Sequence, residues 1–370
     1  MDNVILGFGA MRLPQKDKND YKSIDMEEFI QMVDYYMEQG FDYFDTSYVY
    51  HDEESEPALK KALIERYPRE SFRIADKIPT WMLTKESDNE KFANIMLERL
   101  GIEYFDVLLI HNINKAFIKI AESCNSFEYL KKSKEEGKAK KVGFSFHDKA
   151  EVLEEVLEKY GDMIDVVQIQ LNYLDWHNKT VQSKKCHEIC VKYNVEIIVM
   201  EPVKGGTLVN VADNIKEQFN EFSNISIPEW ALRFAGSQEN VSTVLSGMSN
   251  LEQMRENCET FKDFKKINQD EHSFLMKMAR EIRKTRVVDC SYCGYCVKEC
   301  EMNIPIPDYF ELYNCEKLYS LRVNFANYDT FTETNAPASA CTQCRNCIDI
   351  CTQQLDIPEL LIKVADLFEE

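Results

Sequence analysis

The stretch FDVLLIHNINKAFIKIAESCNSFEYLKKSKEEGKAKKVGFS, residues 105–145, decides the fold. Residues 105–111 have a continuous apolar centre, which is typical of a strand covered on both faces in a parallel sheet. Residues 121–136 carry apolar side chains at helical spacing, and Gly137 ends this predicted helix. Residues 140–145 return to a strand pattern. The stretch therefore predicts two parallel strands joined by a helix.

The same alternation extends from this unit toward both ends of the first two thirds of the chain. Eight short strands are predicted, and each is followed by a helical segment. The strands are residues 4–6, 41–45, 73–77, 105–111, 140–145, 166–170, 195–200 and 241–247. Eight such units in about 260 residues predict an α/β fold, the (β/α)8 TIM barrel. The alternative is a doubly wound sheet, but the turn G-x-G-x-x-G that typically follows its first strand does not occur here.

The composition excludes several classes of protein. The chain has 370 residues and a formal net charge of −20, from 64 acidic and 44 basic side chains, which argues against a nucleic-acid partner. Hydrophobic residues make up 44%, as in a globular protein rather than a disordered one. No apolar run approaches the roughly 18 residues of a membrane helix, and the N-terminus lacks the features of a signal peptide. We therefore expect a cytoplasmic protein with no membrane partner.

Eight of the 13 cysteines lie in two runs, CSYCGYCVKEC at residues 290–300 and CTQCRNCIDIC at residues 341–351. An offset of 51 residues places all four cysteines of one run on those of the other, which indicates an internal duplication. Each run reads C-x2-C-x2-C-x3-C, the bacterial ferredoxin spacing for [4Fe–4S] clusters. The fourth cysteine of such a run binds the other cluster in proteins that hold two.

The duplication therefore predicts two [4Fe–4S] clusters with crossed ligation. One cluster would be held by Cys290, Cys293, Cys296 and Cys351. The other would be held by Cys341, Cys344, Cys347 and Cys300. Zinc is the alternative, although zinc sites made of four cysteines usually draw two C-x2-C pairs from separated segments. The chain thus divides into a barrel at residues 1–265, a helical linker at 266–289, and a small ferredoxin-like iron–sulfur domain of helices and loops at 290–370.

Four polar side chains lie at or after the carboxyl ends of successive predicted strands, where such barrels carry their catalytic groups. They are Asp45, Tyr50, Lys77 and His111. A tyrosine with its ordinary pKa of about 10 is a poor proton donor near neutral pH unless an ammonium stabilises its phenolate. Lys77 would provide that ammonium, Asp45 would hold the lysine, and His111 would orient a carbonyl oxygen. Three further side chains are expected at the pocket mouth: His51, Trp81 and His147.

The motifs LGFGAMRLP at residues 6–14, FDTSYVYHDEESE at 44–56, LERLGIEYFDVLLIH at 97–111 and VLSGMSNLEQMREN at 244–257 occur in this order. With them the chain resembles an aldo–keto reductase fused to a C-terminal dicluster ferredoxin-like domain. The resemblance implies that the four strand-end residues form that family's catalytic tetrad. It also implies hydride transfer between a nicotinamide, NAD(P)H, and a small carbonyl or alcohol substrate, with Tyr50 as general acid.

The resemblance further implies a nicotinamide site. Ser145 and Gln168 would hold the carboxamide, and Met200 stands where the family has an aromatic ring. The segment that binds the adenosine phosphate would comprise Gly247, Met248, Ser249, Gln253, Glu256 and Asn257. Gly247 and Gln253 replace residues that are commonly basic, and a 2′-phosphate without those cations has little charge pairing. We therefore expect either that NADH is preferred over NADPH or that nicotinamide binding is weak.

The two kinds of redox chemistry do not join directly. A nicotinamide transfers a hydride, whereas a [4Fe–4S] cluster moves one electron at a time. A flavin would connect them, but no flavin motif is visible. Three functions follow. The first is a carbonyl reductase whose clusters exchange electrons with ferredoxin or another redox protein. The second is a nicotinamide enzyme whose clusters are structural or redox-sensing. The third is an electron-transfer or docking protein that uses the barrel as a scaffold.

Overall fold

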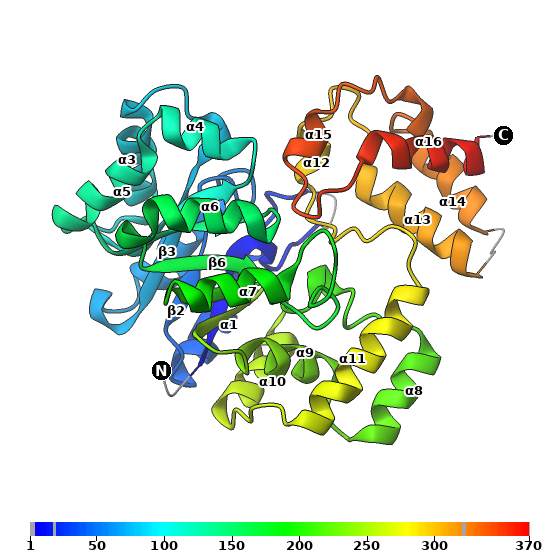
Figure 1. Cartoon of the computed structure of the whole chain (residues 1–370), viewed down its shortest axis with the longest axis horizontal. Coiled ribbons are helices and arrows are strands. Elements are labelled where there is room, and N and C mark those ends of the chain that lie inside the picture. The colour runs from blue at the N-terminus through cyan, green and yellow to red at the C-terminus, as the bar shows by residue number, and fades with distance from the viewer. Residues whose placement is uncertain (1–3, 18–19, 320–322, 370) are drawn as a thin grey trace.

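The computed structural model describes residues 4–17, 20–319 and 323–369, and it shows a barrel with a smaller domain packed against it (Figure 1). The barrel is closed: its strands pair in chain order, all parallel, and the last pairs with the first. The strands are β1 (Ile5–Gly9), β2 (Tyr43–Asp45), β3 (Arg73–Pro79), β4 (Phe105–Ile113), β5 (Ala139–Phe146), β6 (Val166–Gln170), β7 (Glu196–Met200) and β8 (Val241–Ser246). The predicted (β/α)8 barrel is therefore confirmed.

Helices cover the outside of the barrel and make up most of the C-terminal domain (Figure 1). The barrel helices are α1 (Met26–Glu38), α2 (Ser55–Leu59), α3 (Ser87–Leu100), α4 (Phe117–Ser123), α5 (Ser126–Glu135), α6 (Ala150–Tyr160), α7 (Ser183–Lys192), α8 (Asp213–Phe222), α9 (Ile227–Gly236), α10 (Leu251–Lys262) and α11 (Gln269–Lys284). The C-terminal helices are α12 (Tyr295–Lys298), α13 (Ile306–Tyr319), α14 (Val323–Thr332), α15 (Asn346–Asp349) and α16 (Ile357–Phe368).

Local sequence signals account for several helix boundaries. Asp25 caps α1, because its side chain accepts hydrogen bonds from the backbone N–H groups of Glu27 and Glu28. Gly101 ends α3 in the left-handed conformation, with a φ of 74°. One predicted helix is interrupted in the structure. The helix expected over residues 121–136 is divided into α4 and α5, since Asn125 adopts a φ of 52° between them.

The helical linker predicted over residues 266–289 contains helix α11, which packs on the barrel. Its buried side chains Leu275, Met278 and Ile282 belong to the continuous hydrophobic core of the barrel. It runs beside α8, which it contacts (Figure 1). The segment is therefore a structured part of the barrel surface, and the C-terminal domain begins after it.

The C-terminal domain repeats one structural unit. Helices α12 and α15 begin 51 residues apart, and so do α13 and α16. The same offset relates the buried residues that form the core of this domain: Ile306 with Ile357, Phe310 with Leu361, and Tyr313 with Val364. The duplication predicted from the cysteine spacing therefore extends to the helices and to the buried core residues of this domain.

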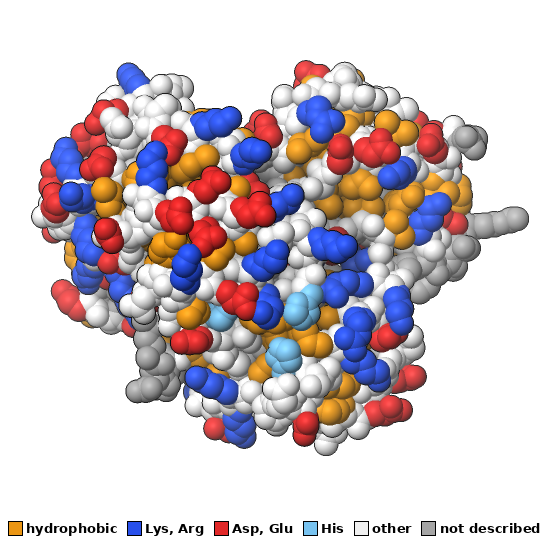
Figure 2. All heavy atoms as spheres, viewed as in Figure 1, with side chains coloured by type: hydrophobic (Ala, Val, Ile, Leu, Met, Phe, Trp, Pro, Cys, Tyr) orange, Lys and Arg blue, Asp and Glu red, His pale blue; other side chains and the backbone are white. Residues whose placement is uncertain are grey.

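The charged side chains form no single block on the face seen in Figure 2, where acidic and basic groups are mixed. No helix in the described part of the chain is long and apolar enough to cross a bilayer.

Candidate active site and cluster sites

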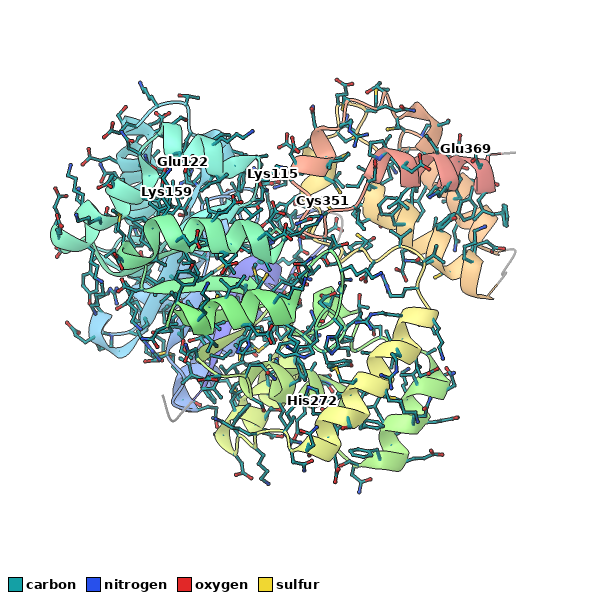
Figure 3. The ribbon with its side chains drawn as sticks, in the orientation of Figure 1. Lys115, Glu122, Lys159, His272, Cys351 and Glu369 are labelled. Atoms are coloured by element: carbon teal, nitrogen blue, oxygen red, sulfur yellow. The ribbon has the colours of Figure 1, made fainter. Side chains whose placement is uncertain are left out.

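A cavity lies at the carboxyl ends of the barrel strands, and both domains contribute to its wall. Asp45, Tyr50 and His111 line it from the barrel, and Cys293 and Tyr295 line it from the C-terminal domain. Figure 3 places Cys351, another of the repeated cysteines, at the junction of the two domains. The C-terminal domain therefore covers part of the barrel end at which the carboxyl ends of the strands lie.

Lys77 brings together three of the four strand-end residues. Its ammonium donates hydrogen bonds to Asp45 Oδ1 at 2.5 Å, to the carbonyl of Thr46 at 2.7 Å, and to the Tyr50 hydroxyl at 3.4 Å. Lys77 and Asp45 are both buried, so solvent does not screen their ion pair. Asp45 also accepts a hydrogen bond from Gln168 Nε2 at 2.9 Å. The carboxylate is therefore fixed from two sides.

His111 completes the group from β4. Ser47 Oγ lies 2.9 Å from its Nδ1, which leaves Nε2 as the ring nitrogen available to a ligand. Burial, with the Lys77 ammonium nearby, holds the pKa of His111 well below its ordinary value. Burial also lowers the pKa of the neighbouring His147 to about 3. Both imidazoles are therefore neutral near neutral pH, and His111 is suited to hydrogen bonding rather than to donating a proton as imidazolium.

The pKa of Tyr50 departs from the expectation that Lys77 lowers it. Burial raises this pKa well above its ordinary value, the Asp45 carboxylate raises it further, and a hydrogen bond with Tyr295 opposes the rise. The Lys77 ammonium is already paired with Asp45, so its charge is largely compensated where the phenol lies. The sequence shows which residues meet here but not the burial that dominates their protonation.

Most residues predicted to hold a nicotinamide line this same cavity. They are Gln168, Met200, Gly247, Met248, Ser249, Gln253, Glu256 and Asn257. Ser145 is placed differently, since its hydroxyl accepts a hydrogen bond from the backbone N–H of Asn112 at 2.8 Å. The Gln253 side chain accepts from the Ser249 N–H at 2.8 Å, and Asn257 donates to Ser246 at 2.9 Å. These contacts order the loop that follows β8.

Arg12 is a lining residue that the sequence reasoning missed. Its guanidinium pairs with Glu201 at 3.7 Å and donates to the carbonyl of Ser291 at 3.2 Å. Among the described residues that line the cavity, it is the one positively charged side chain. The motif LGFGAMRLP contained the signal, because Arg12 lies three residues after the carboxyl end of β1.

The three residues expected at the pocket mouth are separated. His147 lines the cavity, whereas Trp81 lines a neighbouring one. His51 lies inside the protein, with Nδ1 2.7 Å from the carbonyl of Tyr21 and Nε2 accepting from the Leu13 N–H at 3.1 Å. His51 therefore secures the N-terminal loop and does not reach the mouth.

Two small cavities in the C-terminal domain are each lined by four cysteines. The first has Cys290, Cys293, Cys296 and Cys351, and the second has Cys300, Cys341, Cys344 and Cys347. These are the sets of four that crossed ligation predicts. In the first set, the backbone N–H groups of Tyr292 and Leu355 donate to Cys290 Sγ and Cys351 Sγ at 3.4 Å each. Four thiols with backbone donors facing them fit an iron–sulfur cluster.

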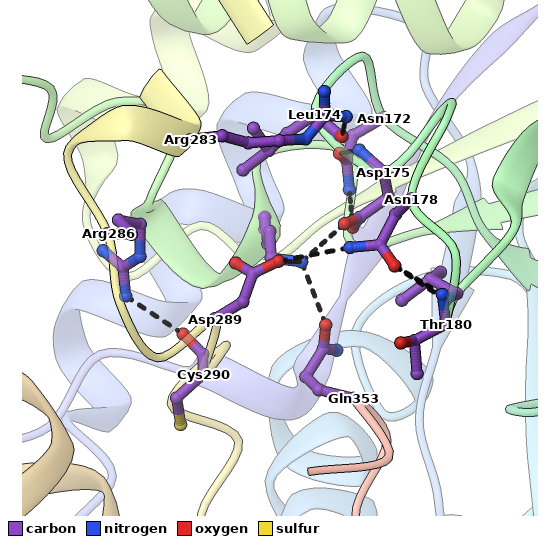
Figure 4. Close-up of polar contacts among 12 residues, drawn as sticks. Asn172, Leu174, Asp175, Asn178, Thr180, Arg283, Arg286, Asp289, Cys290 and Gln353 are labelled. Carbon is purple, nitrogen blue, oxygen red and sulfur yellow. Dashed lines mark hydrogen bonds and ion pairs between the residues drawn. The ribbon is translucent and has the colours of Figure 1, made fainter. Parts of the chain in front are cut away.

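A buried polar network fixes the C-terminal domain to the barrel (Figure 4). Lys204, which is fully buried, donates to Asp175 at 2.6 Å and to Gln353 at 3.0 Å, and it pairs with Asp289 at 3.1 Å. The amides of Gln353 and Gln170 exchange hydrogen bonds at 2.9 and 3.1 Å. Because Asp289 and Gln353 flank the first cysteine set in the sequence, the network holds that set over the barrel.

Gly205 permits a close approach between the two domains. It adopts a φ of 60°, and a β-carbon at this position would lie 2.0 Å from the carbonyl oxygen of Ser291. A side chain cannot be accommodated there without moving the backbone that leads into the first cysteine set.

Comparisons with known proteins place the barrel among oxidoreductases. The model of the aldo/keto reductase family matches residues 5–279, and the chain belongs to that family. The model of a 4Fe-4S dicluster domain matches residues 289–355, which confirms the iron–sulfur character of the cysteine runs. The resemblance identified from the sequence motifs is therefore confirmed in both parts.

The curated relatives are distant. The chain is 25% identical over 209 residues to "Probable aldo-keto reductase 1" of Glycine max, a match that spans 54% of this chain and 56% of that protein. It is 24% identical over 216 residues to the "9,11-endoperoxide prostaglandin H2 reductase" of Trypanosoma cruzi, spanning 57% of this chain and 70% of that one. The chain thus spans little more than half the length of the soybean protein.

Solved structures agree on the barrel. An aldo-keto reductase of Bacillus halodurans in its holo form superimposes with a TM-score of 0.61 at 20% identity, covering 74% of this chain and 91% of that one. An aldo/keto reductase of Klebsiella pneumoniae in complex with NADP and acetate gives a TM-score of 0.57 at 16% identity, covering 74% and 90%. At these identities the likeness shows the fold alone.

Proposed function

We propose that the barrel transfers hydride between a nicotinamide and a carbonyl or alcohol substrate, with Tyr50 as general acid. The observation that carries the proposal is the contact of one buried ammonium, Lys77 Nζ, with both Asp45 and Tyr50, which line the cavity. A bound reduced nicotinamide supplies the hydride. Tyr50 gives its proton to the carbonyl oxygen, and Lys77 lies beside the phenolate that remains. Neutral His111 donates from Nε2 to the same oxygen.

The residues that would hold the nicotinamide favour NADH. Gln168 and Met200 line the cavity that Asp45 and Tyr50 also line, and residues of the loop after β8 line it too. Gln253 and Asn257 are polar but uncharged, and Arg12 is already paired with Glu201. A 2′-phosphate would therefore find little charge to pair with, which supports NADH over NADPH.

The cysteines would hold two [4Fe–4S] clusters that move single electrons. The first set lies nearer the substrate, because Cys293 lines the same cavity as Tyr50. The second set is farther out, and Cys344 in it is exposed. This order supports an external partner, ferredoxin or another redox protein, that exchanges electrons at the second set. Hydride transfer moves two electrons and a cluster moves one, so coupling them requires a cofactor that can do both, and flavins are the chemical class that can.

Replacement of Tyr50 tests the reductase. Tyr50→Phe is expected to lower carbonyl turnover about 100-fold or more while the Kd for NADH stays unchanged. Tyr48→Phe is the matched control, since Tyr48 lies in the same loop and is 7% exposed, as Tyr50 is. Undiminished turnover in Tyr50→Phe would refute the assignment. Intact clusters without any nicotinamide-dependent turnover in the wild type would instead support the electron carrier on a barrel scaffold.

Replacement of cysteines tests the electron path. Cys293→Ser and Cys344→Ser are expected to abolish electron exchange with reduced ferredoxin, and Cys315→Ser, outside both sets, is expected to retain it. Retention of ferredoxin-linked activity by both cluster variants would exclude transfer through the clusters and leave a structural or sensing role.

A further inference from the structure

The backbone that follows Tyr50 forms a left-handed turn. Three consecutive residues, His51, Asp52 and Glu53, adopt φ angles of 52°, 51° and 74°, and none of them is glycine. In this region the β-carbon lies too close to the following carbonyl oxygen, so residues other than glycine usually adopt it singly. Such strain persists only where the surrounding contacts impose it, and it is frequent at active sites. The turn therefore needs contacts that hold it, and it lies directly beside the proposed general acid.

The turn closes on the backbone of Tyr50. The Tyr50 carbonyl accepts hydrogen bonds from the N–H groups of Glu53 at 3.1 Å and Ser55 at 3.2 Å. The hydroxyl of Tyr50 lies 3.4 Å from Lys77 Nζ, which is longer than an ordinary hydrogen bond. A change of the turn to right-handed angles would move both backbone donors and the Tyr50 peptide with them. Because the contact with Lys77 is already long, a small displacement of Tyr50 would break it.

The two ends of the turn are held by the barrel. His51 Nδ1 lies 2.7 Å from the carbonyl oxygen of Tyr21, and His51 Nε2 accepts a hydrogen bond from the Leu13 N–H at 3.1 Å. Glu53 forms an ion pair with Arg99 of α3. These contacts fix the first and the third residue of the turn.

The middle of the turn is held by the C-terminal domain. Lys298, the last residue of α12, forms an ion pair with Asp52 across the domain boundary. Its ammonium also lies 5.2 Å from the centre of the Tyr21 ring. That ring stacks on His51 with centroids 4.4 Å apart. One cation therefore contacts the turn directly at Asp52 and indirectly, through Tyr21, at His51.

We propose that Lys298 is a positioning residue for the reductase: it holds the turn at residues 51–53 left-handed and so keeps the Tyr50 hydroxyl beside Lys77. This inference rests on the proposed reductase function. Lys298 lies between a cysteine of the first set and a cysteine of the second, so it belongs to the segment that joins the two cluster sites. The iron–sulfur domain thus takes part in proton transfer by placing the acid, without supplying a group that touches the substrate.

Lys298→Met removes the cation, and Lys298→Arg keeps it. The pair with Asp52 is partly exposed, and pairs of this kind change an equilibrium by a factor of about five at most. We expect Lys298→Met to lower kcat for 4-nitrobenzaldehyde and NADH about fivefold with an unchanged KM, and Lys298→Arg to retain kcat. Lys363→Met is the matched control, because its exposed pair with Glu359 lies on α16 of the same domain. Wild-type kcat in Lys298→Met with intact iron content would overturn the proposal.

Two substitutions of Asp52 separate the strain from the charge. Asp52→Gly and Asp52→Ala both remove the carboxylate, but glycine adopts left-handed angles freely and alanine does not. We therefore expect kcat to be about fivefold or more higher in Asp52→Gly than in Asp52→Ala. We also expect Lys298→Met to cause no further loss when it is combined with Asp52→Gly. Equal losses in the two Asp52 variants would overturn the proposal, and this comparison leaves the cysteine run unchanged if Lys298→Met loses iron.

Backbone hydrogen exchange separates this inference from the reductase itself. Residues 50–55 are expected to exchange faster in Lys298→Met and in Asp52→Ala than in the wild type, and at the wild-type rate in Lys363→Met. Unchanged exchange in both of the first two variants overturns the positioning role, whatever their turnover. The expected change in exchange, together with no nicotinamide-dependent turnover in any of the proteins, overturns the reductase and leaves the contact of Lys298 with the turn.

Discussion

The ammonium of Lys77 lies 2.5 Å from the carboxylate of Asp45, and side-chain exposures of 0% and 3% leave the pair almost without solvent. Lys77→Met would leave this carboxylate buried and unpaired, which costs about 3–5 kcal/mol of unfolding free energy. We expect that loss in chemical denaturation, together with loss of carbonyl turnover. Lys134→Met is the control, because its partner Asp165 and Lys134 itself are partly exposed, and such pairs contribute about 1 kcal/mol or less. Wild-type stability in Lys77→Met would contradict a buried ion pair.

Crossed ligation predicts which cysteine variants share a spectrum. Cys351→Ser is expected to perturb the same cluster as Cys290→Ser, although Cys351 lies in the second run. Electron paramagnetic resonance of the reduced proteins measures this, and Cys315→Ser is expected to retain the wild-type spectrum and iron content. The interpretation fails if the spectrum of Cys351→Ser matches that of Cys341→Ser instead.

The buried carboxyl of Glu56 predicts a pH dependence of stability. Burial raises its pKa from 4.5 to about 7, while hydrogen bonds from Asp76 and Arg99 oppose the rise and Glu53 adds to it. The folded protein therefore keeps a proton that the unfolded chain releases, so stability falls as the pH rises from about 4.5 to about 7. Glu56→Gln removes this ionisation. We expect the Tm of Glu56→Gln, relative to that of the wild type, to rise as the pH increases across this range. A Tm difference that does not change with pH would contradict the raised pKa of Glu56.

Lys204 predicts how firmly the domains are joined. Lys204→Met leaves Asp175 buried without its cation, and we expect a loss of about 3–5 kcal/mol of unfolding free energy. We also expect faster hydrogen exchange in residues 286–293, where Asp289 loses its partner. Lys216→Met is the control, since its pair with Asp213 is exposed on α8 and is worth about 1 kcal/mol or less. Equal exchange in the two variants would show that the network does not hold the domains together.

The barrel was predictable because its signals are local. An apolar run such as β4, a cap such as Asp25 and a helix end such as Gly101 each depend on residues close in the sequence. The strand-end residues were predictable for the same reason, since parallel strands bring their carboxyl ends to one edge. Helix α8 was not predicted. The break at Asn125 was not predicted either, because asparagine can adopt right-handed or left-handed helical backbone angles.

The shared cavity was not predictable, because it depends on how two domains dock. Tyr295, Gln353 and Lys204 lie far apart in the sequence, and no periodic pattern connects them. One signal was present in the repeat. Tyr295 corresponds to Asn346 under the 51-residue offset, so the aromatic ring that lines the shared cavity in one copy is a polar side chain in the other.

The close approach at Gly205 limits which substitutions this two-domain protein can accept during evolution. A methyl group there would meet the Ser291 carbonyl oxygen, so a glycine-to-alanine change would displace the backbone that leads into the first cysteine set without altering any cysteine or any of the four strand-end residues. One substitution at this position therefore changes how the C-terminal domain meets the barrel while the side chains of both candidate sites stay the same.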